Sequence, residues 1–111
     1  MSLSKQQAEF AADVARLILH INEAGYTCTF GEAWRPAVTA EYYAKAGIGT
    51  KDSLHLERLA IDLNLFRNGS WLSSTEAHRQ FGEYWESLSP LNRWGGRFAK
   101  PDGNHYERRK A

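Results

Sequence analysis

The sequence has one cysteine, almost no net charge and no long apolar run, and each absence excludes a class of protein. Cys28 has no partner for an internal disulfide, so the fold must be stable without one. Fourteen Lys and Arg residues against thirteen Asp and Glu give a net charge of +1, which provides no general attraction for nucleic acid or an anionic membrane. No segment reaches the roughly 18 apolar residues that a membrane-spanning helix needs.

The N-terminal region does not have the pattern of a secretory signal peptide. Residues 1–7 are mostly polar, and the apolar stretch after them is interrupted by Asp13, Arg16 and His20. We therefore expect the protein to be made in the cytoplasm without a signal peptide. Its 111 residues, 42% of them hydrophobic, suit a single domain over residues 1–111.

Apolar periodicity predicts helices and short strands in separate blocks. Helices are expected from Ser4 to just before Gly25, from Thr39 to Ala46 with Gly47 and Gly49 as its end, and from Ser73 to Leu88, and strands over 26–30, 60–66, 70–72 and 105–107. Residues 54–56 and 60–66 also fit a helix, but Ile61, Leu63 and Leu65 alternate with polar residues, which favours extended chain. The short connections predict an α+β fold with a small antiparallel sheet flanked by helices.

Four residues carry the chemistry that the sequence suggests: His55, Asp62, Asp102 and His105. Two neutral imidazoles and one carboxylate are a common set of catalytic zinc ligands, with one position left for water. On a single helix His55 and Asp62 would lie roughly 10 Å apart along the axis. On two extended pieces both can reach one ion, so the zinc and strand interpretations support each other.

Three motifs follow one another along the chain: Ser53-x-His55-x-x-x-x-Ala60-x-Asp62, then Trp94-Gly95-Gly96, then Asp102-x-x-His105-Tyr106-Glu107. Together they resemble the zinc peptidases of D-alanyl-D-alanine carboxypeptidase type. That family includes phage L-alanyl-D-glutamate endolysins and the vancomycin-resistance dipeptidases, and it is distantly related to the hedgehog domain. The resemblance extends from about Arg35 to Glu107, and the ordered combination is specific where a single motif would be weak.

The resemblance implies a role for each matching residue. His55, Asp62 and His105 would bind one zinc ion per chain, and Asp102 would be the general base. Arg35 would bind the substrate or stabilise the developing oxyanion. Further residues would contact the substrate or support a ligand: Ser53, Trp94, Gly95 and Gly96 at the substrate, and Glu107 behind the zinc ligands.

Several of these residues also have ordinary structural explanations. Asp102 before Gly103 fits a turn, Arg35 fits a surface ion pair, and Glu107 is a rival base because it shares the face of His105 on a strand. Arg58 stands where the family usually has glycine, so the turn after His55 must differ or direct a long side chain to solvent. We also expect His20 and His78 on the surface, and Trp34, Trp71 and Trp85 in packing roles.

The function favoured by the sequence is hydrolysis of peptidoglycan stem peptides by a zinc metallopeptidase. The short chain without a signal peptide favours an L-alanyl-D-glutamate endopeptidase of the endolysin type, from a phage or prophage, that acts as a monomer on the cell wall after release or delivery. A D-alanyl-D-alanine carboxypeptidase is the alternative. Two further classes stay open: a metal-dependent nuclease, which the near-neutral charge disfavours, and a non-catalytic zinc-binding module.

Overall fold

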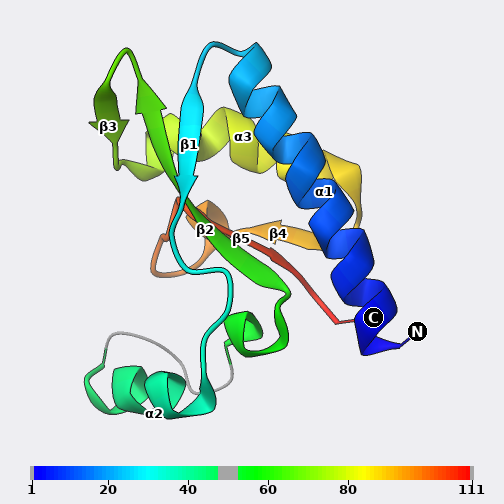
Figure 1. Cartoon of the computed structure of the whole chain (residues 1–111). Coiled ribbons are helices and arrows are strands. Elements are labelled where there is room, and N and C mark those ends of the chain that lie inside the picture. The colour runs from blue at the N-terminus through cyan, green and yellow to red at the C-terminus, as the bar shows by residue number, and fades with distance from the viewer. Residues whose placement is uncertain (1, 48–52, 111) are drawn as a thin grey trace.

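The computed structural model describes residues 2–47 and 53–110. The described residues form three α-helices, five short strands and two 3-10 helices (Figure 1). In chain order these are α1 (Leu3–Glu23), β1 (Thr27–Phe30), α2 (Ala37–Lys45), η1 (Leu54–Glu57), β2 (Ala60–Arg67), β3 (Ser70–Leu72), α3 (Thr75–Leu88), β4 (Asn92–Trp94), η2 (Gly95–Arg97) and β5 (His105–Arg108). This confirms the predicted α+β class with a small sheet flanked by helices.

The sheet has the strand order β1-β2-β5-β4. Strand β3 lies outside this order and pairs with the last residues of β2. All of its pairings are antiparallel, including β2 with β5, where Asp62 lies opposite His105. The turn between β2 and β3 has Asn68 and Gly69 at positive φ, as a two-residue hairpin requires. The strands predicted over 60–66 and 70–72 are therefore confirmed.

Successive side chains of β2 and β5 point alternately into the core and to the polar face of the sheet. Ile61, Leu63 and Leu65 of β2 and Tyr106 of β5 point into the hydrophobic core. That core is completed mainly by side chains of α1 and α3: Phe10, Val14, Leu17, Ile21, Phe81 and Trp85. The intervening residues, including Asp62 and His105, point to the opposite face.

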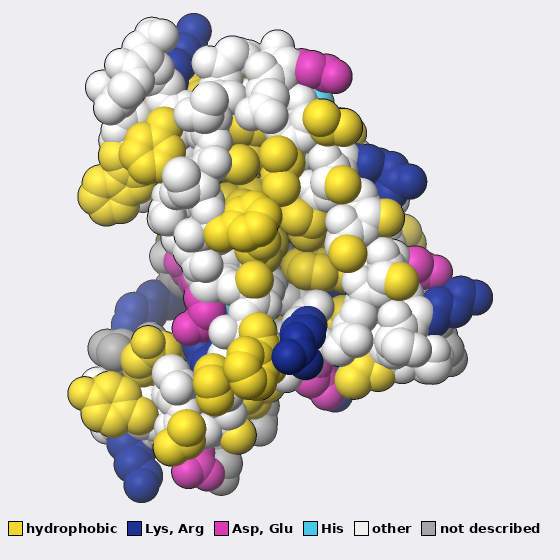
Figure 2. All heavy atoms as spheres, viewed as in Figure 1, with side chains coloured by type: hydrophobic (Ala, Val, Ile, Leu, Met, Phe, Trp, Pro, Cys, Tyr) yellow, Lys and Arg dark blue, Asp and Glu magenta, His cyan; other side chains and the backbone are white. Residues whose placement is uncertain are grey.

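Helix α2 lies apart from α1 and α3, at the end of the molecule where β2 begins (Figure 1). Its only buried residue is Ala40, whereas Val38 and Tyr42 are largely exposed. Figure 2 shows hydrophobic side chains gathered over this region and between α1 and β1. None of the described helices has the length and hydropathy needed to cross a bilayer.

The structure corrects the predicted helix starts. Helix α1 begins after Ser2, whose Oγ accepts from the Lys5 amide, and α3 begins after Ser74, whose Oγ accepts from the Ala77 amide. Helix α2 begins after Pro36, so Thr39 lies inside it. Gly49, expected near its end, lies outside the described residues.

Three other sequence expectations were wrong. Residues 54–57 form a 3-10 helix and are not extended. His78 is buried rather than exposed, and its Nδ1 is 2.8 Å from the Tyr106 hydroxyl, which supplies the partner that a buried imidazole needs. Trp34 and Trp71 are exposed, whereas Trp85 is fully buried as predicted.

Candidate metal centre

Three side chains from separate segments converge on the polar face of the sheet. His55, Asp62 and His105 each offer a ligand atom, and the three atoms lie within 4.8 Å of one another. Asp62 Oδ1 is 3.3 Å from His55 Nε2 and 3.2 Å from His105 Nδ1. Asp62 and His105 meet because they are cross-strand neighbours of β2 and β5.

His55 reaches the same point because the short helix η1 turns the chain back toward β2. Ser53 caps this helix, and its Oγ accepts from the His55 amide at 3.2 Å. The helix ends at Arg58, which adopts the left-handed conformation with φ 56° and ψ 36°. Glycine adopts this conformation more readily than any other residue, but the position is held by arginine, whose guanidinium lies over the Trp34 ring, 4.7 Å from its centroid.

The donor set fits a zinc ion. Zinc bound tetrahedrally to nitrogen and oxygen at about 2.0–2.2 Å holds neighbouring ligand atoms roughly 3.3 Å apart. The two contacts to Asp62 Oδ1 have this spacing. Two imidazoles with one carboxylate also match the ligand chemistry of catalytic zinc sites.

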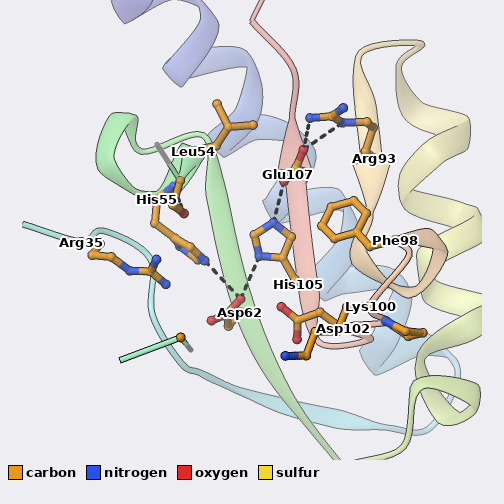
Figure 3. Close-up of a pocket in the computed structure, with 13 residues that line it drawn as sticks. Arg35, Leu54, His55, Asp62, Arg93, Phe98, Lys100, Asp102, His105 and Glu107 are labelled. Carbon is orange, nitrogen blue, oxygen red and sulfur yellow. Dashed lines mark hydrogen bonds and ion pairs between the residues drawn. The ribbon is translucent and has the colours of Figure 1, made fainter. Parts of the chain in front are cut away.

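Glu107 and Arg93 fix the orientation of His105 (Figure 3). His105 Nε2 donates to Glu107 Oε1 at 2.7 Å, so Nδ1, which lies 3.2 Å from Asp62 Oδ1, is the ring nitrogen that a metal ion could bind. The other oxygen, Glu107 Oε2, accepts from Arg93 Nε at 2.8 Å. Because Glu107 is buried and both of its oxygens are engaged, it is poorly placed to act as a base.

Asp62 and His105 each stabilise the charged form of the other. Burial opposes ionisation of Asp62, but hydrogen bonds from His105 and His55 outweigh it and lower the pKa of the carboxyl to about 2. Burial also disfavours the His105 cation, yet hydrogen bonds to Asp62 and Glu107 raise its pKa to about 9. The raised pKa favours a protonated His105 in the metal-free protein, so a metal ion that binds this ring must displace a proton.

The cluster opens into a pocket of about 750 Å³. Asp102 lines it beside His105, on a loop that is held at both ends. The Asp102 amide donates to the Gly95 carbonyl at 2.9 Å, and the Asp102 carbonyl accepts from the His105 amide at 3.1 Å. Partial burial and the nearby Asp62 carboxylate raise the pKa of Asp102, against the opposing charges of His105, His55 and Arg35.

Arg35 lies on the opposite side of the pocket from Asp102, next to His55 (Figure 3). Its Nε donates to Glu32 Oε1 at 2.6 Å, and its amide donates to the His55 carbonyl at 3.2 Å. Its guanidinium also lies 5.1 Å from the centroid of the Tyr43 ring. These contacts hold one always-charged group at the pocket wall.

Three residues expected at the substrate, Trp94, Gly95 and Gly96, do not line the pocket. Trp94 is fully buried, and its Nε1 donates to the Gly103 carbonyl at 2.7 Å. Gly95 is also buried, and a Cβ atom there would lie 2.3 Å from the Asp102 carbonyl oxygen. The Trp94-Gly95-Gly96 motif therefore packs the loop that carries Asp102, and its glycines serve internal contacts rather than the approach of substrate.

Sequence reasoning missed other residues that line this pocket. Arg93, Phe98 and Lys100 belong to it, and Glu32 lies behind it as the partner of Arg35. Arg93 pairs with Glu107 across β4 and β5, so recognition of residues 92–94 as a strand would have indicated this ion pair. The loop residues Phe98 and Lys100 give no such periodic signal.

Comparison with known proteins agrees with this geometry. A family model described as D-alanyl-D-alanine carboxypeptidase matches residues 46–108, more than half of the chain. No curated protein matches the chain in sequence.

Two solved structures share the fold. The L-Ala D-Glu endopeptidase ChiX from Serratia marcescens matches with a TM-score of 0.72 over 95% of this chain and 84% of its own, at 19% identity. A mutant of the vancomycin-resistance D,D-pentapeptidase VanY, from a VanB-type cassette and in complex with Zn(II), matches with a TM-score of 0.62 over 89% and 70% of the two chains, at 16% identity. The fold that the sequence motifs indicated is thereby confirmed.

Proposed function

Because the chain belongs to the D-alanyl-D-alanine carboxypeptidase family, we propose that it is a zinc-dependent peptidase that hydrolyses peptidoglycan stem peptides. The observation that carries the proposal is the convergence of His55, Asp62 and His105 in a pocket that Asp102 also lines. The family model provides the peptidase class, and the zinc complex of VanY supports the choice of metal.

In this proposal His55 Nε2, Asp62 Oδ1 and His105 Nδ1 hold the zinc ion. When bound, zinc with three protein ligands supplies Lewis acidity and lowers the pKa of water. Glu107 keeps His105 in the tautomer that presents Nδ1, and Arg93 in turn holds Glu107. Ser53 holds the backbone of His55 through its hydroxyl.

Asp102 accepts the proton of the attacking water and delivers it to the leaving amine. Its raised pKa makes it a stronger base than an ordinary carboxylate, and no hydrogen bond to its carboxylate is formed by the described residues. Arg35 stabilises negative charge on the carbonyl oxygen from the other side of the pocket. The two groups thus act on opposite ends of the bond that breaks.

The bond we propose is that between L-alanine and D-glutamate. The L-Ala D-Glu endopeptidase ChiX matches over nearly the whole of this chain, which supports this assignment. A D-alanyl-D-alanine carboxypeptidase is the second candidate, because the matching family model bears that description. In either case the protein acts on the cell wall.

Digestion of purified sacculi by the zinc-loaded protein tests the proposal. Mass spectrometry should show muropeptides with a new amino group on D-glutamate, and free D-alanine would instead support the carboxypeptidase. A chelated sample and the Asp102→Ala variant are the controls, and both should release no product. Bound zinc without release of any muropeptide would overturn the enzymatic proposal in favour of a binding module, and plasmid nicking would favour a nuclease.

A further inference from the structure

Three Lys and Arg side chains line the pocket, and two of them already have anionic partners. Arg35 is paired with Glu32, and Arg93 is paired with Glu107. The third is Lys100, for which the described part of the chain provides no ion pair or hydrogen bond. An exposed ammonium beside a catalytic pocket can bind an anion without first breaking an internal ion pair.

The loop places Lys100 on the same side of the pocket as Asp102 (Figure 3). Lys100 precedes Pro101, which favours extended backbone at this residue. Asp102 follows immediately and is fixed through its amide to the Gly95 carbonyl. The position of Lys100 is therefore tied to that of the proposed base, and both lie across the pocket from Arg35.

The position of the base identifies which part of a substrate lies nearby. Asp102 delivers its proton to the leaving amine, so the residue that bears this amine lies on the Asp102 side of the pocket. Substituents of that residue are then within the range of the long, flexible side chain of Lys100. Arg35, on the other side, faces the carbonyl that is attacked.

We propose that Lys100 binds a carboxylate on the substrate residue whose amino group is released, and that it makes the enzyme selective for substrates that are anionic there. This inference rests on the proposed function and specifies its substrate class. Both candidate substrates have a carboxylate on the residue whose amino group is released. A terminal D-alanine has its C-terminal carboxylate, and D-glutamate has a carboxyl group that is not part of the cleaved bond. A neutral carboxamide at this place would lose the charge-assisted hydrogen bond.

The test compares two synthetic peptides that contain the L-Ala–D-Glu bond, one with the free carboxylate on D-glutamate and one with this group as its amide. With zinc-loaded parent enzyme, amidation should lower kcat/KM about 10- to 100-fold, as expected for one hydrogen bond to a charged group. Lys100→Met should lower kcat/KM by a similar factor on the free acid and by less than about 2-fold on the amide. Lys100→Arg should restore part of the loss. The same comparison is made with a D-Ala-D-Ala peptide and its C-terminal amide.

Arg97→Gln is the matched control. Arg97 is three residues away, is paired with Glu86 and does not line the pocket, so its loss removes a positive charge without removing the proposed contact. It should reduce kcat/KM equally and only slightly on both peptides. Zinc content and Tm are measured for each variant to establish that the site is intact.

The outcomes separate the two proposals. If the zinc-loaded parent cleaves the acid and amide peptides equally well, or if Lys100→Met reduces both rates by the same factor, the role of Lys100 is overturned and the peptidase assignment stands. If the parent cleaves none of the four peptides, the proposed function fails and the inference about Lys100 fails with it.

Discussion

Asp102 and Glu107 lie on either side of His105 in the sequence, but their surroundings suit them to different roles. Glu107 is buried and has one oxygen on His105 and the other on Arg93. Asp102 lines the pocket and has a raised pKa, caused mainly by its partial burial. The first environment suits a group that orients a metal ligand, and the second suits a group that exchanges protons.

At Asp102 the substitution Asp102→Asn should remove the base while preserving the size of the side chain. We expect kcat to fall about 10²- to 10⁴-fold, the usual contribution of general acid–base catalysis. Zinc content and Tm should stay at the parent values, because Asp102 is not among the three converging donors. Steady-state kinetics on a stem peptide measures the effect, and a kcat like that of the parent would exclude Asp102 as the base.

At Glu107 the substitution Glu107→Gln should weaken zinc binding about 10- to 100-fold, because the amide is a poorer acceptor for the His105 Nε2 proton. Competition with a chromophoric chelator measures the affinity. Glu76→Gln is the control, since Glu76 forms a surface ion pair with Arg79 and is not among the residues that line the pocket. An unchanged zinc affinity in the Glu107 variant would show that this hydrogen bond does not support the ligand.

At the scale of elements, the alternation of apolar and polar residues made strand β2 predictable. The exact start of α3 and the turn after η1 could not be predicted in this way. Ile61, Leu63 and Leu65 form one buried face, as their spacing indicated. Two adjacent serines precede α3, so sequence alone did not distinguish Ser73 from the true cap, Ser74. The turn at η1 depends on a left-handed Arg58, a conformation that arginine rarely adopts and that its sequence position does not reveal.

Part of the site was predictable because two of its residues lie on strands that the sequence indicates. Pairing of β2 with β5 places Asp62 opposite His105, so the motifs that mark these strands also bring two donors together. The positions of Arg93 and Lys100 depend on the short strand β4 and on the loop after η2. Elements of three residues have too little apolar periodicity to be recognised in the sequence.

The contact between η2 and the loop that follows it supports a prediction at this scale. Gly95→Ala would place a Cβ atom 2.3 Å from the Asp102 carbonyl oxygen and 2.8 Å from His105 Cβ, so the backbone must move. We expect a loss of about 1–3 kcal/mol in the free energy of unfolding, together with a lower kcat. Urea denaturation and peptide kinetics measure the two effects. Ala99→Ser, an exposed position in the same loop, should change neither, and a fully active Gly95→Ala variant would contradict the packing role of Gly95.

At the scale of the whole molecule, one pair of strands serves both stability and function. Tyr106 and Ile61 face the core, while His105 and Asp62, next to them in the chain, face the pocket. Arg108 Nη2 donates to Glu9 Oε2 at 2.6 Å and so ties the end of β5 to α1, which leaves the two ends of the chain close together (Figure 1). Because the pKa of His105 in the folded protein differs from that of an unfolded histidine, protonation in the pocket also affects the stability of the fold.

This coupling predicts how the stability of the metal-free protein depends on pH. An unfolded histidine has a pKa of about 6.5, whereas His105 in the folded protein has a pKa of about 9. Between pH 7 and 9 the folded state therefore holds a proton that the unfolded state has released, so the free energy of unfolding falls as the pH rises, by up to about 1.4 kcal/mol per pH unit. Urea denaturation of chelator-treated protein at several pH values measures this slope. His105→Gln should abolish it, as should saturation with zinc, which replaces the proton. Equal stability of the metal-free parent at pH 7 and pH 9 would show that His105 is not held as a cation by Asp62 and Glu107.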